Sequence, residues 1–351
     1  MGVSYERIAR DVAFTLSVKS PKIFENIFLN NGVLVLMGLK GRVRIVAGGN
    51  RFDERTRLGQ NSNVDHRDKF AAISTNMQNN VVTAYYGQAV CDGAAMVNLV
   101  EEDQNAGPQR IEALAEDAIE ECMNTFPNKI ADALMKSTST SVDPTSIVEE
   151  LPATAFGSQT QTTGGIVRSD YPGTSDPTKA WQTQYSNDSA DLSSEAGIAT
   201  VSKFIWACSP GGSALSERPD ICLTTTGVIA KASAKGDVLR RFDTNDKLAK
   251  FGFDNFSLLN CAFIADRNVG SKKGYFLNVN YMRIQVLGGA RTRRTRSIKV
   301  IGDGATAVPL QVRPPIESYN ELNYAIKMYI VYNLTFGGLR QHGLMDNLTE
   351  A

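Results

Sequence analysis

The chain has 351 residues, of which 21% are charged, and its 37 basic and 37 acidic residues leave a formal net charge of zero. Its length allows a sizeable core and suggests two or three lobes, or one extended subunit with several lobes. The balanced charge excludes a global field that attracts nucleic acid or an anionic membrane. No apolar run approaches the roughly 20 residues that span a bilayer, and residues 1–10 lack a signal pattern, so we expect the chain to stay in the cytoplasm in which it is made.

The cysteines of the chain are widely spaced, odd in number and without a Cys-x-x-Cys pair. This usage predicts neither a disulfide framework nor a zinc site. We expect most of them to be buried, reduced thiols that pack as small apolar groups. They are Cys91, Cys122, Cys208, Cys222 and Cys261.

The first predicted strand follows a mixed, polar N-terminal stretch that we interpret as an arm, residues 1–41. Val43 and Ile45 alternate with charged residues until Gly48 and its glycine neighbour break the run, which is typical of a strand that enters a hairpin. Residues 81–90 are rich in β-branched and aromatic side chains, and we expect them to form the returning strand.

Between these strands lies a long charged segment with few aromatic residues. Such a segment cannot bury itself, and a structureless loop of this length is rare inside a compact domain. We therefore expect it to project as the tip of a hairpin and to become ordered on a neighbouring molecule, which favours an assembly subunit over an enzyme. Its mixed charges would fix register and orientation more than they supply affinity. The expected interface residues are Arg51, Asp53, Glu54, Arg55, Arg57, Asp65, Arg67, Asp68 and Lys69.

The most regular helical pattern spans residues 108–136. Asn105 can cap the first turn, in which Pro108 loses no hydrogen bond. Apolar residues recur at spacings of three and four with acidic residues on the other face, and Pro127 predicts a kink. The apolar stripe comprises Ile111, Leu114, Ala115, Ala118, Ile119, Cys122, Met123 and Phe126, and it continues through Ile130, Ala133 and Leu134.

The remainder of the chain predicts an α+β fold, because strands and helices do not alternate regularly. Residues 137–191 are rich in Ser, Thr and Gly and predict loops with short strands. A second helix is expected at 194–208, capped by Ser193 or Ser194 and ended by Pro210. Further strands are predicted at 219–225, 258–264, 274–278 and 326–334, and a weak helix at 227–234.

The order of these pieces resembles the major capsid proteins of tailed bacteriophages, which have the Hong Kong 97-type fold. The hairpin corresponds to the E-loop of that family, and the long helix to its spine helix. A Gly-Gly-Ile-x-Arg stretch at residues 164–168 precedes Trp181 and Asn187, as family members often show. The resemblance divides the chain into an N-terminal arm at 1–41, the E-loop hairpin with flanking strands at 42–90, the peripheral domain with the spine helix at 91–190, the axial domain at 191–300, and a return to the peripheral domain with C-terminal strands at 301–351.

The resemblance implies a structural protein of the virion and not an enzyme. Pentamers and hexamers would build an icosahedral shell around double-stranded DNA, assembled in the host cytoplasm, with the E-loop lying over a neighbouring subunit. The implied partners are further copies, a portal protein, and a separate scaffold or decoration protein; no cofactor and no membrane are implied. Some family members crosslink an E-loop lysine to an asparagine of a neighbour, and Lys69 is the nearest candidate.

Two alternatives remain beside this interpretation. An encapsulin-like compartment shares the fold but encloses protein cargo. A cytoplasmic hydrolase would require a nucleophile and a base, yet the two histidines, His66 and His342, do not neighbour a nucleophile elbow, so we expect them to be solvated or interfacial.

Two other groups of charged residues could bind a cation, but ordinary surface charge explains them better. Asp65, His66 and Asp68 have the chemistry of a metal site but lie on an expected mobile tip, and the acidic helix face at Glu112, Glu116 and Glu120 is better explained by solvation. No phosphate-binding glycine motif occurs, so no catalytic, metal or cofactor site is assigned.

One dense basic cluster follows Gly288 and its glycine neighbour. It could contact the phosphates of packaged DNA, pair with acidic residues of an adjacent subunit, or form a plain solvated loop, and the sequence leaves these three interpretations open. The cluster comprises Arg291, Arg293, Arg294, Arg296 and Lys299.

Overall fold

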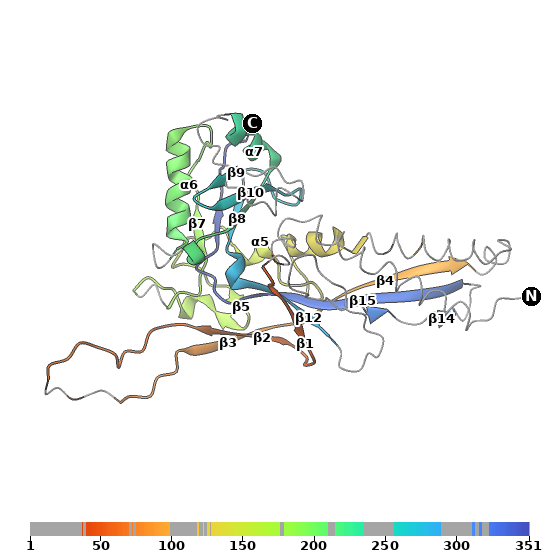
Figure 1. Ribbon diagram of the computed structural model, residues 1–351, viewed down its shortest axis with the longest axis horizontal. Helices are drawn as coiled ribbons and strands as arrows, with labels where there is room; N and C mark the ends of the chain where they lie inside the picture. Colours follow the sequence, from red (N-terminus) through yellow and green to blue (C-terminus); the bar gives the residue numbers. More distant parts are fainter. Residues whose placement is uncertain are drawn as a thin grey trace, which may run out of the picture. The chain divides into compact units, whose positions relative to one another are not determined.

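In the computed structural model, the chain folds into two compact units, and each unit combines segments that are distant in the sequence (Figure 1). Unit 1 comprises residues 1–50, 87–146 and 284–334, and unit 2 comprises 51–86, 147–283 and 335–351. The structure describes residues 37, 40–69, 72, 75–98, 118, 122, 125–126, 128–175, 179–209, 215–234, 256–288, 311–312, 316–317 and 323–350.

Unit 1 is built on a mixed sheet of six strands. Its long central strand confirms the strand predicted at 326–334, but the predicted alternation ends at Ile330, and Val331–Phe336 are all buried. It pairs antiparallel with the strand before the long helix, from Asn323 opposite Asn98 to Tyr332 opposite Ala89. The strands are β1 (Val43–Val46), β12 (Met282–Leu287), β15 (Asn323–Phe336) and β13 (Gln311–Val312) in this order, while β4 (Ala89–Asn98) and β14 (Ile316–Glu317) also pair with β15. Strands β12 and β15 continue into unit 2.

The long helix is described only in part. Residues 128–134 are helical, as are Ala118, Cys122 and Phe126, which confirms the helix over these positions. A Cβ atom on Gly93 would lie 2.8 Å from the Cys122 sulfur and 2.9 Å from the Phe126 ring, so these two residues of the predicted apolar stripe pack on β4. Pro127, Glu112, Glu116, Glu120, most of the N-terminal arm and the rest of the helix lie outside the described residues.

Unit 2 contains a second six-stranded sheet with two helices packed in its core. Ser194 caps the longer helix, as predicted, because its hydroxyl accepts a hydrogen bond of 3.0 Å from the Gly197 N–H. Phe204 of this helix meets Phe276 of the sheet edge to face, with 5.2 Å between ring centroids. The sheet order is β7 (Gln184–Ser186), β16 (Gly343–Met345), β11 (Gly274–Leu277), β8 (Ile221–Thr224), β10 (Cys261–Ala265) and β9 (Phe256–Leu258), and the helices are α6 (Glu195–Ala207) and α7 (Thr226–Ala234).

The remaining elements of unit 2 are short, as predicted for residues 137–191. They are α5 (Ile147–Glu150), β5 (Thr162–Thr163), β6 (Ile166–Val167), the 3₁₀ helices η1 (Arg168–Asp170), η3 (Leu215–Glu217) and η4 (Val279–Tyr281), and the hairpin β2 (Phe52–Arg57) and β3 (Val81–Tyr86). No helix of the described residues has the length and apolar character needed to cross a membrane.

The thiols of the chain are free, and three of them, Cys208, Cys222 and Cys261, are fully buried in unit 2. This confirms the prediction that most cysteines are reduced core residues. Burial raises the pKa of each of these three thiols, so they remain protonated and unreactive at neutral pH.

Candidate assembly interface

The charged segment of the sequence forms an antiparallel hairpin, with Phe52 opposite Tyr86 and Arg57 opposite Val81. The prediction that Val43–Val46 is its outgoing arm is wrong, because β1 pairs in parallel with β12. The outgoing arm is β2, which the sequence analysis had assigned to the charged tip. The predicted returning strand is also two strands, since β3 ends at Tyr86 and β4 begins at Ala89.

Strand β2 has one buried face, although four of its six residues are charged. Phe52, Glu54 and Thr56 are buried, whereas Asp53, Arg55 and Arg57 are exposed. The expectation that this segment cannot bury itself is therefore wrong for Glu54. Its carboxylate accepts a hydrogen bond of 2.7 Å from the Arg283 guanidinium, and such a partner makes burial of a charge tolerable.

Two further polar contacts hold the hairpin base on unit 2. The Thr56 hydroxyl donates to the Gly337 carbonyl at 2.8 Å. On the other strand, the Tyr86 hydroxyl lies 3.2 Å from both the carbonyl and the amide nitrogen of Phe336, so it can donate to one and accept from the other. Burial, with Glu150 adding to it, raises the pKa of Tyr86 well above its usual range, so the phenol stays protonated.

Strand β3 packs against the turn between β5 and β6. The Tyr85 N–H donates to the Gly164 carbonyl at 2.8 Å. Gly164 has a φ of +57°, and a Cβ there would lie 2.7 Å from the Ala84 methyl and 3.0 Å from the Tyr86 ring. A glycine is needed for both reasons, the left-handed backbone and the close approach of β3.

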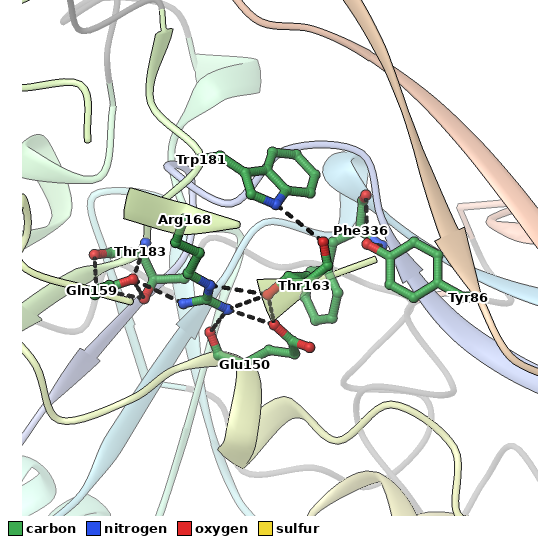
Figure 2. Close-up of polar contacts among 8 residues, drawn as sticks. All are labelled: Tyr86, Glu150, Gln159, Thr163, Arg168, Trp181, Thr183 and Phe336. Carbon is green, nitrogen blue, oxygen red and sulfur yellow. Dashed lines mark hydrogen bonds and ion pairs between the residues drawn. The ribbon is translucent and has the colours of Figure 1, made fainter. Parts of the chain in front are cut away.

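Directly behind this turn, Arg168 is the centre of a buried polar network (Figure 2). Its guanidinium is fully buried and donates to the Glu150 carboxylate at 2.5 Å, to the Glu150 carbonyl at 2.9 Å, to the Thr163 hydroxyl at 2.9 Å and to the side-chain carbonyl of Gln159 at 2.8 Å. The Thr163 hydroxyl in turn donates to the Glu150 carboxylate, and the Trp181 indole donates to the Thr163 carbonyl at 3.3 Å. Gln159 also donates to the Thr183 carbonyl at 2.8 Å.

Through Arg168, the Gly-Gly-Ile-x-Arg stretch therefore stabilises the packing of the segments around it. Burial raises the pKa of Glu150, but the Arg168 guanidinium opposes this shift, so the pair is held as an ion pair by mutual contact. An ion pair enclosed in this way stabilises the structure only while both partners are present. Its members point at each other and at the backbone, so the arrangement fixes geometry and presents no accessible nucleophile.

The tip of the hairpin, residues 58–80, is organised by its own polar groups. Asn63 donates to the Asn76 carbonyl at 2.6 Å, and Asn80 donates to the Gln60 carbonyl at 2.8 Å. Two large apolar side chains of the tip are nevertheless exposed, Val64 by 81% and Met77 completely. Their own unit leaves both side chains uncovered, so they are available for contact with another molecule.

The predicted charged residues of the tip are displayed and do not form a metal site. Asp65, His66, Arg67, Asp68 and Lys69 are all exposed. Each carboxylate accepts the N–H of the following residue, at 2.8 Å for Asp65 and 2.7 Å for Asp68. Among the described residues, no group of three or more potential metal ligands comes together.

Arg51, Asp53 and Tyr85 lie on the exposed side of the hairpin base. The guanidinium of Arg51 lies 3.8 Å above the Tyr85 ring and 3.5 Å from the Asp53 carboxylate, in an exposed pair. Such exposed pairs contribute little to stability but shape the surface that a partner meets.

The prediction that both histidines are solvated or interfacial is wrong for His342. Its side chain is fully buried, and its Nδ1 accepts a hydrogen bond of 3.1 Å from the Asn278 N–H. The ring meets Phe336 edge to face at 5.3 Å. Burial lowers the pKa of His342 to about 3, so the ring is a neutral core residue. The sequence carries no signal for this, because the partners come from distant segments.

A second exposed apolar surface lies on unit 1, and the sequence analysis missed it. Ile316 is paired with Ala325, and Ala325 with Met96, so the three form one row across β14, β15 and β4. Ile316 is exposed by 49% and Met96 by 56%. The nearly continuous apolar composition of β4 was the available signal, since a strand with one solvated face usually alternates. The basic cluster Arg291, Arg293, Arg294, Arg296 and Lys299 lies outside the described residues.

The α+β architecture, with its long hairpin, amphipathic helix and two sheets, is that of the Hong Kong 97-type capsid proteins, as the sequence resemblance predicts. The capsid subunit of cyanophage A-1(L) superposes with a TM-score of 0.61 at 13% identity over 90% of this chain and 93% of that one. The capsid of the empty GTA particle gives 0.52 at 12% identity over 89% and 90%, and that of Myoviridae phage XM1 gives 0.50 at 14% over 89% and 92%. No known family and no curated protein matches the sequence itself.

Proposed function

We propose that the chain is a major capsid protein whose copies form pentamers and hexamers of an icosahedral shell that encloses double-stranded DNA. The observation that carries this proposal is the capsid fold over 90% of the chain. The protein would then reside in the virion after assembly in the host cytoplasm, and a portal protein and a scaffold or decoration protein would be its partners.

The hairpin tip supports this function because it offers an apolar contact that its own unit does not cover. Val64 and Met77 are exposed, and the charged residues Asp65, Arg67, Asp68 and Lys69 follow Val64 in the tip. In a shell, the tip would lie over a neighbouring copy, where apolar burial would supply affinity and the charges would fix register. The row at Ile316 and Met96 is a second surface that a neighbour would cover.

The proposed function also assigns the regions of the chain to the domains of a capsid subunit. Residues 191–300 would be the axial domain around the centre of a capsomer, and residues 91–190 with the spine helix, together with 301–351, would be the peripheral domain. The basic cluster at residues 291–299 would contact DNA phosphates or an adjacent subunit. A non-enzymatic role agrees with the interior of unit 2, where Arg168 and His342 serve structural contacts.

The test is to express the chain and examine it by negative-stain electron microscopy and by size-exclusion chromatography with light scattering. Closed shells or capsomer rings are expected, and nuclease-protected DNA in particles from infected or induced cells would complete the assignment. Shells that retain a protein cargo and no DNA would instead identify an encapsulin-like compartment. A monomer that persists at high concentration and with scaffold candidates added would contradict both shell functions.

A further inference from the structure

Glu54 differs from every other charged residue that the sequence assigns to the interface. It is 6% exposed, whereas Arg51, Asp53, Arg55 and Arg57 of the same arm are all exposed. Its carboxylate faces inward and is held by Arg283 at 2.7 Å, with side-chain exposures of 7% for Glu54 and 39% for Arg283. A residue in this position cannot meet a partner molecule, so its charge acts inside the subunit.

Arg283 belongs to β12, a strand that begins in unit 2 and continues as Ile284–Leu287 in unit 1. There β12 pairs in parallel with β1, with Val43 opposite Ile284 and Val46 opposite Leu287. Strand β1 leads through residues 47–51 directly into β2, which carries Glu54. Strand β2 is therefore linked to β12 in two ways: through the chain to β1, which pairs with β12, and directly through the ion pair.

The start of β12 is itself fixed to the end of β15. The Thr335 hydroxyl donates to the Arg283 carbonyl at 3.2 Å, and the Gly337 N–H donates to the Tyr281 carbonyl at 2.8 Å. Since the Thr56 hydroxyl donates to the Gly337 carbonyl, β2, β12 and the end of β15 form one polar cluster. Arg283 supplies the cluster with its charged contact to β2.

We propose that the Glu54–Arg283 pair is a positioning latch that fixes the direction in which the hairpin leaves unit 2 and makes β2 follow displacements of β12. Its consequence for assembly rests on the proposed function, in which the hairpin tip meets a second copy. Without the pair, β3 is still held by Gly164 and Tyr86, while β2 keeps its pairing with β3, the buried Phe52 and the Thr56 hydrogen bond. The hairpin would then pivot about β3, and the tip would meet its neighbour over a wider range of directions.

The experiment compares Glu54→Gln, which removes the charge at constant shape, with Asp53→Asn on the exposed face of the same strand. Hydrogen–deuterium exchange of the full chain is measured for residues 52–57 and 81–86, with α6 as the internal reference. We expect Glu54→Gln to accelerate exchange at 52–57 on the order of tenfold, and Asp53→Asn to leave it unchanged. The double variant Glu54→Arg with Arg283→Glu, which restores the pair in reverse, is expected to recover the slow exchange.

Unchanged exchange in Glu54→Gln would overturn the latch, and so would a failure of the reversed pair to recover slow exchange while α6 remains protected. If Glu54→Gln accelerates exchange in α6 as well, Arg283→Gln is measured instead, because it removes the positive charge from the partly exposed member of the pair. Normal exchange at 52–57 in that variant would overturn the latch.

Assembly is then scored by electron microscopy of the same proteins. Glu54→Gln should give irregular or open shells and Asp53→Asn closed ones, and closed shells from a variant with a loosened hairpin would overturn the positioning role. If the wild-type chain forms no shells under any condition, the proposed function fails, while the exchange measurements still decide on the latch.

Discussion

The interior of unit 2 and the tip of the hairpin are both rich in polar residues, but the two regions use them in opposite ways. Arg168 is buried and donates to Glu150, Thr163 and Gln159, whereas Arg67 is exposed and donates to two carbonyls of its own loop. His342 is enclosed in the core, and His66 is exposed. Residue type alone therefore does not decide burial. Acceptors from Glu150, Gln159 and Thr163 surround the buried guanidinium of Arg168, whereas Arg67 meets the carbonyls of Asn63 and Ala72.

Replacement of the two arginines should show this difference most strongly. Arg168→Met removes one partner of a buried ion pair and leaves Glu150 uncompensated, so we expect a loss of about 3 to 5 kcal/mol in the free energy of unfolding. Arg67→Met should change it by less than about 0.5 kcal/mol. Urea unfolding followed by tryptophan fluorescence measures both, and equal losses in the two variants would contradict the comparison.

The two histidines test the same contrast through pH. The pKa of His342 is about 3 in the folded chain and near 6.5 when the imidazole is exposed. Because the folded value is the lower one, stability is full above pH 6.5 and falls as the unfolded chain takes up the proton. Between pH 7 and pH 4 this contribution amounts to about 3 kcal/mol.

His342→Gln should remove this part of the acid sensitivity, and His66→Gln should leave it intact. Carboxylates also contribute to acid unfolding, since the pKa of Asp143 is lowered to about 2 by its contacts with Lys136 and Thr140. The informative quantity is therefore the difference between each variant and the wild type, measured by urea unfolding at several pH values. An acid slope unaltered by His342→Gln would show that the buried ring does not stay neutral.

Two adjacent glycines in the turn that contacts β3 provide a third test. Gly164 and Gly165 both have positive φ, so alanine should cost about 1 kcal/mol of backbone strain at either position. A Cβ at Gly164 would also press on Ala84 and Tyr86, whereas at Gly165 nothing lies within 4 Å. We expect Gly164→Ala to cost about 1 to 2 kcal/mol more than Gly165→Ala in urea unfolding. Equal costs would mean that β3 does not rest on this turn.

The sequence predicted those parts of the fold whose pattern is local. The strand at 326–334, the Ser194 cap and the strand β8 were all predicted correctly, because each depends on residues within one element. Strand β2 was not, because its inward Glu54 breaks the apolar alternation and its partner Arg283 is 229 positions away. The charged tip was predicted as a displayed segment, but its exposed Val64 and Met77 could be located only once the burial of each side chain was known.

The smallest effect on stability is expected at the tip, where the effect on assembly should be large. The double variant Val64→Ser with Met77→Ser removes two exposed apolar side chains, so the free energy of unfolding should change by less than about 0.5 kcal/mol. If both side chains become buried on a neighbour, replacing each of them weakens association by about 1.5 kcal/mol or more, and the protein concentration needed for shells should rise at least about tenfold. Light scattering across a concentration series measures this threshold. Val142→Ser, at a site exposed by 72% in unit 1, is the matched control and should leave the threshold in place. Equal thresholds in the wild type and the tip variant would place the apolar contact elsewhere, and the row at Ile316 and Met96 would become the next surface to change.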